Sequence, residues 1–338
     1  MHVGSILPRG QHAAIEGSGA RRYNSGMNTH HTVGFDKPRL LIVGCGDVGM
    51  RLLTLVRARF RVFAVTSQPG RCAELRAAGA IPIVADLDRP ETLARLAGLA
   101  QRVVHLAPPP QDGALDLRTR NLIAILPNGA RVVYVSTTGV YGDRGGAATP
   151  ETTPVAPRNA RARRRVDAEL VLRAWALASG GKVAILRAPG IYAADRLPLE
   201  RLRRGTPALA HADDVYTNHI HADDLARLCA LALWRARPGR VYNASDDSRL
   251  KMGDYFDVVA DAFGLARPPR LPRAELAATV SPMLLSFMSE SRQLDNRRIK
   301  GELRVRLAHP RVEEFVARQG GCGPREGQDP GAKKDPSR

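Results

Sequence analysis

The stretch that decides the fold is Leu40-Leu-Ile-Val-Gly44-Cys45-Gly46-Asp47-Val48-Gly49. An apolar run leads into the pattern Gly-x-Gly-x-x-Gly, and a helical pattern follows over 50–56. In this context Gly44 makes a tight turn, Gly46 lets the backbone approach a pyrophosphate, and Gly49 lets the helix pack closely on the strand. The helix N-terminus adds N–H groups and a positive dipole end. The stretch predicts a dinucleotide site, and the alternative is a glycine-rich turn without a ligand.

Short β-branched runs alternate with helical patterns after this stretch. The runs cover 40–43, 62–66, 81–84, 103–106, 132–136 and 183–186. Helical patterns lie between them, for instance over 71–78 and 91–99. Such alternation is typical of βα units that build a parallel sheet. We therefore expect an α/β fold, a Rossmann-type doubly wound parallel sheet with a small C-terminal substrate lobe.

Composition and pattern suggest the domain boundaries. Residues 1–36 and 319–338 lack sustained periodicity and predict a disordered N-terminal extension and a disordered tail. The NAD(P)-binding Rossmann domain is expected over 37–186, with the sheet rejoined near 215–245. The smaller substrate lobe is expected over 187–214 and 246–318, where strands give way to loops, Pro-rich turns and helices.

The net charge has two interpretations. The chain has 338 residues, of which 44% are hydrophobic and 25% charged, as in an ordinary globular protein, yet its formal net charge is +18. A basic surface is typical of nucleic-acid binding. Only six of the 51 basic residues are lysine, however, and this arginine bias is typical of a GC-rich genome. Aromatic residues are only 5% and do not interleave with basic ones, so nucleic-acid binding is the less favoured interpretation.

The remaining composition indicates a cytoplasmic protein. No apolar stretch reaches the roughly 18 residues of a membrane span, and we expect no secretory signal and no membrane partner. The four cysteines show no Cys-x-x-Cys pair, so we expect reduced thiols and no structural zinc. Cys45 is expected to be a small buried side chain rather than a reactive thiol.

The end of the second strand bears on the choice of cofactor. An acidic residue about 20 positions after the glycine motif would bind the ribose of NAD, and the chain has none there. Thr66, Ser67 and Gln68 occupy that strand end instead, with Arg71 soon after and Arg51 in the first helix. Hydroxyls and arginine suit the extra phosphate of NADP. NADP is therefore preferred, and NAD is the alternative.

Further motifs follow the glycine motif in a fixed order. They are Asp86-Leu87, Val103 to Ala107, Val135 to Asp143, Glu151 to Pro154, Leu186 to Tyr192, His219 to Asp224 and Val241 to Asn243. From about residue 39 to 315 the series resembles the extended short-chain dehydrogenase/reductases, the NAD-dependent epimerase/dehydratase family. The resemblance implies that Asp86 and Leu87 lie near the adenine. It also implies that Leu106 and Ala107, at the end of the fourth strand, lie beside the cofactor.

The catalytic residues depart from the family pattern. The family uses a hydroxyl residue, a tyrosine and a lysine four residues after it, and the resemblance puts Thr137, Arg161 and Arg165 at these positions. Arg165 could donate to the ribose as lysine does. Arg161 cannot replace the tyrosine, because a guanidinium stays protonated and offers no hydroxyl. The nearest substitutes for the missing acid are Tyr141, Tyr192 and His105, and each is equally well explained as packing or hydrogen-bonded structure.

Two clusters have competing interpretations. The basic segment 158–165 is either a solvated helix face or a set of arginines that bind an anion in the cleft. His219 and His221 stand beside Asp223 and Asp224, which suggests a metal site. The resemblance favours the start of a helix instead, with an aspartate as its cap and dipole partner. We therefore expect no metal.

The function that these observations favour is an atypical NAD(P)(H)-binding oxidoreductase or epimerase-like protein. Its expected substrate is a small sugar-like or carbonyl compound, and the arginines favour an anionic one. A homodimer is one option for its assembly. The first alternative is a non-catalytic NADP(H)-binding sensor or interaction protein that has lost the tyrosine chemistry. Nucleic-acid binding through the basic surface ranks third.

Overall fold

The structure is a computed structural model, and it describes residues 37–321. The extension predicted over 1–36 and the tail over 322–338 lie outside the described residues. Helix α11 (Val312–Gly320) continues past residue 319, where composition places the start of the tail. Its apolar side chains Val312, Phe315 and Val316 are buried in the lobe, which explains why the segment is helical.

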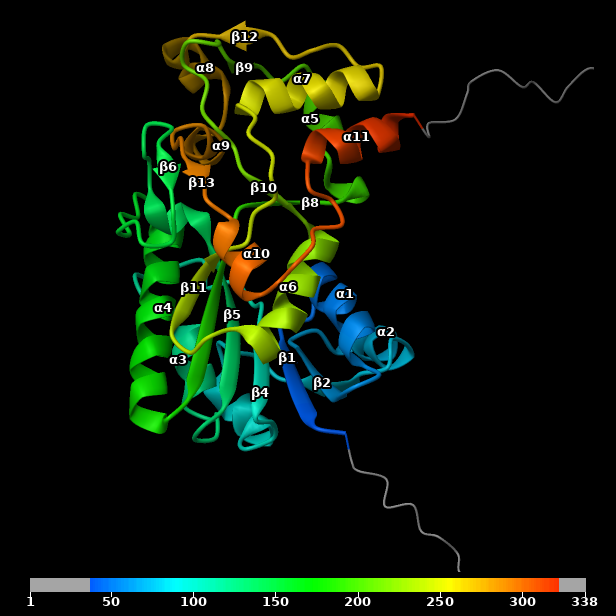
Figure 1. Ribbon diagram of the computed structural model, residues 1–338, viewed down its shortest axis with the longest axis vertical. Coiled ribbons are helices and arrows are strands. Elements are labelled where there is room, and N and C mark those ends of the chain that lie inside the picture. Colours follow the sequence, from blue (N-terminus) through cyan, green and yellow to red (C-terminus); the bar gives the residue numbers. More distant parts are fainter. Residues whose placement is uncertain (1–36, 322–338) are drawn as a thin grey trace, which may run out of the picture. The chain divides into compact units, whose positions relative to one another are not determined.

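A seven-stranded parallel sheet forms the lower half of the molecule in Figure 1. In spatial order its strands are β11 (Arg240–Asn243), β7 (Lys182–Ala188), β5 (Arg131–Thr137), β4 (Arg102–His105), β1 (Arg39–Val43), β2 (Arg61–Thr66) and β3 (Ile81–Val84). The chain order reverses between β1 and β4, and in open α/β sheets ligands bind at such a switch point. The topology confirms the predicted doubly wound parallel sheet.

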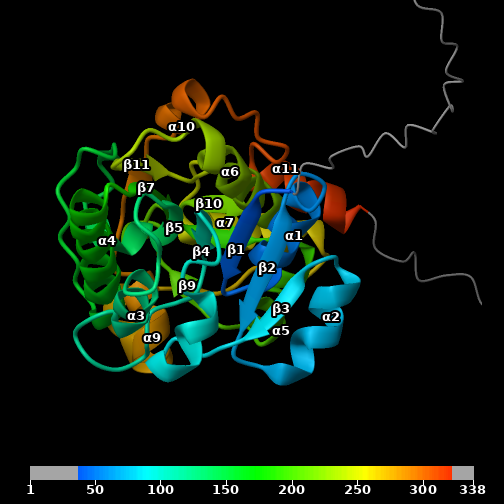
Figure 2. The same cartoon turned by 90° about the horizontal axis from the view of Figure 1, so that it is seen from below.

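Helices cover both faces of this sheet, as Figure 2 shows from below. One face packs against α1 (Asp47–Val56) and α6 (Ala222–Arg235). The other packs against α3 (Leu117–Ile123) and α4 (Ala160–Ser179). Within residues 37–321, no helix has both the length and the apolar character that crossing a bilayer requires.

Some helical segments differ from the sequence-based expectation. The pattern over 91–99 is a 3-10 helix at Pro90–Leu96, and the pattern over 71–78 is a 3-10 turn at Pro69–Arg71 followed by α2 (Cys72–Ala77). A proline begins each 3-10 segment, where its fixed φ suits the helix start and its missing N–H costs nothing. Helix α1 begins at Asp47, before the helical pattern over 50–56 that predicts it.

The upper part of Figure 1 is a lobe of short elements. Its strands form small parallel pairs: β8 (Gly190–Tyr192) with β10 (His219–His221), β9 (Ala208–Leu209) with β12 (Arg270–Leu271), and β6 (Ala148–Thr149) with β13 (Gln293–Leu294). Its helices are α5 (Leu199–Arg203), α7 (Met252–Ala262), α8 (Arg273–Thr279), α9 (Pro282–Phe287) and α11. Helix α10 (Arg297–Glu302) instead packs beside β11, and its Ile299 is buried in the core of the large sheet. A separate apolar cluster of residues between 192 and 316 holds the lobe together.

Only part of the region 215–245 rejoins the large sheet. Strand β11 pairs with β7, but β10 pairs with β8 in its own two-stranded sheet. Pro189 lies between β7 and β8. Because proline has no N–H to donate to a ladder, the chain leaves the large sheet at this residue, and the strand that follows is available to β10.

Each edge strand of the large sheet has a feature that interrupts its free backbone hydrogen-bonding groups. Strand β3 contains Pro82, which cannot donate a backbone hydrogen bond. At the opposite edge, the Arg298 guanidinium on α10 donates to the Val241 carbonyl oxygen of β11 at 2.9 Å. Neither edge therefore presents a regular row of backbone donors and acceptors.

A buried ion pair joins β7 to α4. The Arg187 guanidinium donates to both carboxylate oxygens of Glu169 at 3.0 and 2.6 Å, and each side chain is 5% exposed. The Ser136 hydroxyl donates to the same carboxylate at 2.7 Å, and the guanidinium lies 4.6 Å from the ring centre of Tyr141. Burial lowers the pKa of Arg187, but the hydrogen bonds and charge of Glu169 outweigh it, and the net shift is upward.

Candidate cofactor cleft and catalytic residues

A cavity of about 390 Å³ opens at the carboxyl ends of β1, β2, β3 and β4. Ten residues predicted to bind the cofactor line it: Gly44, Cys45, Gly46, Thr66, Ser67, Arg71, Asp86, Leu87, Leu106 and Ala107. The others that line it are Val43, Val65, Gln68, Ala85, Pro108 and Arg118. The cavity includes the switch point between β1 and β4, where the fold favours ligand binding.

The three glycines of the motif have different structural roles. Gly44 has φ +84°, and a Cβ there would lie 2.5 Å from the Ala107 nitrogen, so neither the backbone conformation nor the space accepts a side chain. A Cβ on Gly49 would approach the Cys45 sulfur to 3.1 Å, which fits close packing of α1 on β1. A Cβ on Gly46 would meet nothing within 4 Å. The fold itself therefore requires glycine at position 44. At position 46 a side chain would fit the fold, and only a ligand close to the backbone would require glycine.

This cradle fits a dinucleotide. Gly46 is the N-cap of α1, and no side chain caps the first N–H groups of that helix. These groups and the helix dipole would hold the pyrophosphate, and Asp86 and Leu87 line the end of the cavity expected for the adenine. When bound, the nicotinamide cofactor supplies a hydride donor or acceptor.

The other residues predicted to bind the cofactor do not line this cavity. Asp47, Val48 and Gly49 lie in the first turn of α1, and Arg165 lies on α4. The Asp47 carboxylate pairs with Arg51 at 2.8 Å and with Arg196 of the lobe at 2.9 Å. Asp47 therefore links the glycine motif to the lobe. Arg51 is also paired, because it donates to Asp223 on α6 at 2.5 Å.

Two arginines line the cavity. Arg71 donates to the Cys45 carbonyl oxygen at 2.6 Å and to Glu74 at 2.9 Å, which holds its guanidinium at the cavity wall. Arg118, which sequence reasoning missed, pairs with Asp88 at 2.6 Å. No spacing pattern connects residue 118 to the glycine motif, so the sequence offered no signal for it. The Cys45 thiol is buried, and burial, partly offset by Arg71, raises its pKa to about 11, as expected for an unreactive side chain.

The structure brings Arg161 and Arg165 together on the first turns of α4, whose N-cap Asn159 accepts the Ala162 N–H. Arg165 is half-buried and donates to the Tyr134 hydroxyl at 2.9 Å and to the Val135 carbonyl oxygen at 3.0 Å. Burial and then the charge of Arg165 lower the pKa of Arg161, and Glu290 of the lobe opposes them. Arg161 itself is exposed and lies one helical turn before Arg165.

Thr137 ends β5, and its Oγ1 accepts the Gly139 N–H at 3.3 Å. Because the oxygen acts as acceptor in that bond, the hydroxyl proton can be donated to another group.

The segment 158–165 is not a uniformly solvated face. Arg158, Arg161 and Arg163 are exposed, whereas Arg164 is buried and donates to the Gly113 carbonyl oxygen at 2.8 Å. Together with the half-buried Arg165, this shows that the run of arginines divides between solvent, structural contacts and the region beside β5.

The three substitutes considered for the missing acid are all structural. Tyr141 is fully buried and donates to Asn243 Oδ1 at 2.7 Å. Tyr192 is 2% exposed and donates to the His309 carbonyl oxygen at 3.4 Å. His105 is fully buried against Thr119 at 3.0 Å, and burial lowers its pKa to about 3, so it stays neutral. None of the three can exchange a proton with a substrate in this arrangement.

The histidine–aspartate segment begins helix α6. His221, rather than an aspartate, is its N-cap, and the Asp223 N–H donates to His221 Nδ1 at 3.2 Å. Asp224 is buried and accepts the N–H groups of Ala308 and His309, both at 2.8 Å. Donor atoms of His221, Asp223 and His309 lie within 4.8 Å of one another, but the Arg51 guanidinium already neutralises Asp223.

A glycine cradle at the switch point of a doubly wound sheet defines a dinucleotide-binding α/β protein. The chain belongs to the NAD-dependent epimerase/dehydratase family, whose model matches residues 40–245. This confirms the resemblance stated from the motifs. A search of curated proteins finds no match.

Solved structures share the fold. A functionally unknown conserved protein from Silicibacter pomeroyi is 29% identical, with a TM-score of 0.71 over 84% of this chain and 99% of that chain. A UDP-glucose 4-epimerase from Thermotoga maritima is 18% identical, with a TM-score of 0.68 over 84% and 97%. A dTDP-glucose 4,6-dehydratase from Streptomyces venezuelae, with NAD bound, is 22% identical, with a TM-score of 0.67 over 84% and 96%. The last two likenesses show the fold alone.

Proposed function

We propose that the chain is an NADP(H)-dependent oxidoreductase that transfers a hydride to or from a small anionic carbonyl or sugar-like substrate. The observation that carries the proposal is the cradle around Gly46, where an added Cβ meets no protein atom and only a bound ligand would require glycine. The epimerase/dehydratase family supports the cofactor class and the type of reaction. The preference for an anionic substrate rests on Arg161 and Arg165.

The chain's own groups suit a reduction without a tyrosine. The Thr137 hydroxyl can donate a hydrogen bond to a carbonyl oxygen, and a nearby guanidinium stabilises the negative charge that develops on that oxygen. Arg161 would supply this charge, or it would hold a carboxylate or phosphate of the substrate through its planar fork. Because a guanidinium does not release its proton, the proton that completes the alcohol would come from water.

Titration of the full chain with NADPH and NADH tests the cofactor. Arg71→Ala is expected to weaken NADPH binding about tenfold and leave NADH binding unchanged, because a charge-assisted hydrogen bond contributes about 1.5–3 kcal/mol. Arg76→Ala is the matched control, since Arg76 is an exposed arginine of α2, the helix that Arg71 precedes, and does not line the cavity. Equal losses for the two cofactors would contradict NADP preference, and no binding of either would refute the proposal.

Substrate turnover tests the role of Arg161. NADPH oxidation is followed with keto acids and with their amides, which keep the carbonyl and lose the charge. Arg161→Gln is expected to lower kcat/KM for the acids about tenfold or more and to change the values for the amides little. Arg163→Gln removes an exposed arginine of the same helix and is expected to change neither. Equal losses for acids and amides would contradict an anion contact.

The non-catalytic sensor is the second candidate. The burial of Tyr141, Tyr192 and His105 favours it, because no replacement for the family's acid is found among these three residues. NADPH binding without turnover of any carbonyl or sugar substrate, in a chain that stays folded, would favour the sensor over the enzyme.

A further inference from the structure

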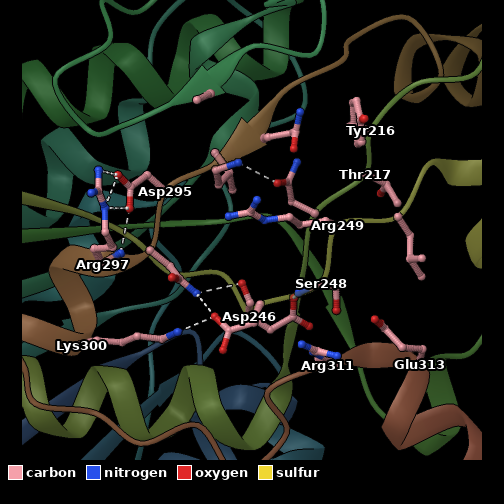
Figure 3. A pocket seen from close by; sticks show the side chains of 17 residues that line it. Tyr216, Thr217, Asp246, Ser248, Arg249, Asp295, Arg297, Lys300, Arg311 and Glu313 are labelled. Atoms are coloured by element: carbon pink, nitrogen blue, oxygen red, sulfur yellow. Dashed lines mark hydrogen bonds and ion pairs between the residues drawn. The ribbon is translucent and has the colours of Figure 1, made fainter.

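A larger cavity, of about 900 Å³, lies at the junction of the lobe and the large sheet. Figure 3 shows the side chains that line it, from the loop 246–250 before α7, the segment 216–218 before β10, β13 with the start of α10, and the start of α11. It shares no lining residue with the cofactor cavity. Its volume lies within the range of about 300–1,000 Å³ of small-molecule sites.

The walls of this cavity carry both charges. Two pairs are neutralised within it: Asp295 with Arg297, and Asp247 with Lys300, each at 2.5 Å. Figure 3 marks these contacts with dashed lines on the left of the view. The charged groups that remain are Asp246 and Glu313, which are acidic, and Arg249 and Arg311, which are basic.

Asp246 is the most unusual of these groups. The residue is 5% exposed; its Oδ1 accepts the Ser248 N–H at 3.0 Å, and its Oδ2 has no hydrogen-bond partner among the described residues. The neighbouring Tyr192 hydroxyl donates to the His309 carbonyl oxygen at 3.4 Å, and its interaction with the Asp246 carboxyl only partly offsets the effect of burial on that group. A buried carboxylate oxygen without a partner costs free energy, so a donor inside the cavity would stabilise it.

Glu313 adds a second acidic group beside the first. Its Oε2 is also buried and has no hydrogen-bond partner within residues 37–321. Burial, with a contribution from the charge of Glu313, raises the pKa of Asp246 to about 8. Two neighbouring carboxyl groups that resist double ionisation are a natural site for an ammonium group, whose charge and N–H donors relieve both the repulsion and the missing hydrogen bonds.

The basic groups suit an anion. Arg249 is exposed at the cavity and makes no ion pair with the part of the chain that the structure describes. Arg311 is 58% exposed, and its contact with Glu314 is long, at 3.8 Å. A guanidinium binds carboxylate or phosphate oxygens through two parallel N–H donors, and neither arginine is committed to a short contact of this kind.

We propose that this cavity is a second binding site, for a small zwitterion whose ammonium group lies between Asp246 and Glu313 and whose carboxylate, sulfonate or phosphate is held by Arg249 and Arg311. The proposal is independent of the cofactor site, because the two cavities have separate walls. The competing interpretation is a crevice between lobe and sheet that holds only water.

Calorimetric titration of the full chain tests the site with three probes, O-phosphoethanolamine, β-alanine and taurine. Each joins an ammonium group to an anionic group through two carbons. Ethylamine and inorganic phosphate carry the two charges on separate molecules. At least one zwitterion is expected to bind about tenfold or more tightly than ethylamine and phosphate at the same ionic strength. Failure of all three probes to exceed both controls would overturn the proposal and favour the water-filled crevice.

Variants of the cavity residues test whether the zwitterion binds in this cavity. Asp246→Asn and Arg249→Gln are each expected to weaken the best zwitterion about tenfold or more. Arg267→Gln is the control and should leave binding unchanged, because Arg267 is exposed, pairs with Asp261 and does not line the cavity. NADPH binding should be the same in all three, which separates this test from that of the cofactor site. Asp246→Asn is also expected to keep or raise the unfolding temperature, because the amide can still accept the Ser248 N–H while the buried carboxyl group is removed. Unchanged zwitterion binding in both Asp246→Asn and Arg249→Gln, or a marked loss of stability in Asp246→Asn, would contradict the proposal.

Discussion

Arg187→Met is expected to lower the free energy of unfolding by about 3–5 kcal/mol, the usual cost of removing one partner of a buried ion pair. The substitution leaves the Glu169 carboxylate, which is 5% exposed, with the Ser136 hydroxyl and no cation. It also removes the guanidinium that packs 4.6 Å from the ring centre of Tyr141. Denaturant unfolding followed by circular dichroism measures the change.

Two further variants separate burial from charge. The double variant Arg187→Met with Glu169→Leu is expected to recover most of the lost stability, because no uncompensated charge stays buried. Arg267→Met removes an exposed arginine that pairs with Asp261 at 2.6 Å, and its effect should be too small to resolve. A double variant as unstable as Arg187→Met alone would show that packing around Tyr141, and not the buried charge, accounts for the loss.

Gly46→Ala is expected to weaken NADPH binding about a hundredfold or more, equivalent to about 2.7 kcal/mol, without loss of stability. In the structure the new methyl group meets no atom within 4 Å, and Gly46 has φ −79°, which alanine adopts readily. The methyl group would instead occupy the space in which a pyrophosphate approaches the backbone. Calorimetry gives the affinity, and thermal unfolding shows whether the fold is intact.

Two other glycines serve as controls for this result. Gly301→Ala, in α10, also meets no atom within 4 Å and should leave NADPH binding unchanged. Gly44→Ala should destabilise the protein itself, because the residue has φ +84° and its Cβ would lie 2.5 Å from the Ala107 nitrogen. Full NADPH affinity in Gly46→Ala would mean that the cofactor does not pass over this loop, and the proposed function would then fail.

The large sheet was predictable because each strand is a continuous β-branched or apolar run bounded by turn residues, as expected for strands buried on both faces. The lobe was not, because its strands are only two or three residues long and pair through contacts distant in sequence, such as Gln293 with Ala148. Pro189 was visible in the sequence. Its consequence, that β8 and β10 leave the large sheet, depends on where the chain goes afterwards, which a local pattern does not contain.

The cofactor cavity was predictable to the extent that its residues follow strand ends. Thr66 is the last residue of β2, and Gly44, Asp86 and Ala107 lie just beyond the ends of β1, β3 and β4. The carboxyl ends of these parallel strands meet at one edge of the sheet. Arg118 does not follow a strand, since it lies in α3 and reaches the cavity through the fold alone. The sequence did not predict the partners of Arg71 either, because its contact with the Cys45 carbonyl oxygen joins two separate loops.

For the catalytic residues, the sequence predicted the positions but not the surroundings. The positions of Arg161 and Arg165 followed from counting along motifs, but their surroundings did not. Arg165 is half-buried and donates to groups of β5, whereas Arg161, one helical turn earlier, is exposed, so the two arginines have different surroundings. The second cavity had no sequence signal either, since Asp246 and Glu313 are distant in sequence and belong to no shared motif.

The interrupted edge strands of the large sheet, β3 and β11, limit how copies of this chain can associate. Strand addition needs a row of unsatisfied backbone donors and acceptors, and Pro82 interrupts that row on β3, while Arg298 occupies the Val241 carbonyl oxygen on β11. Continuous sheets across two molecules, and the edge-to-edge aggregation that such sheets begin, are therefore disfavoured at both ends. A second copy would have to dock on helices or on the lobe, where side chains rather than backbone groups determine the fit.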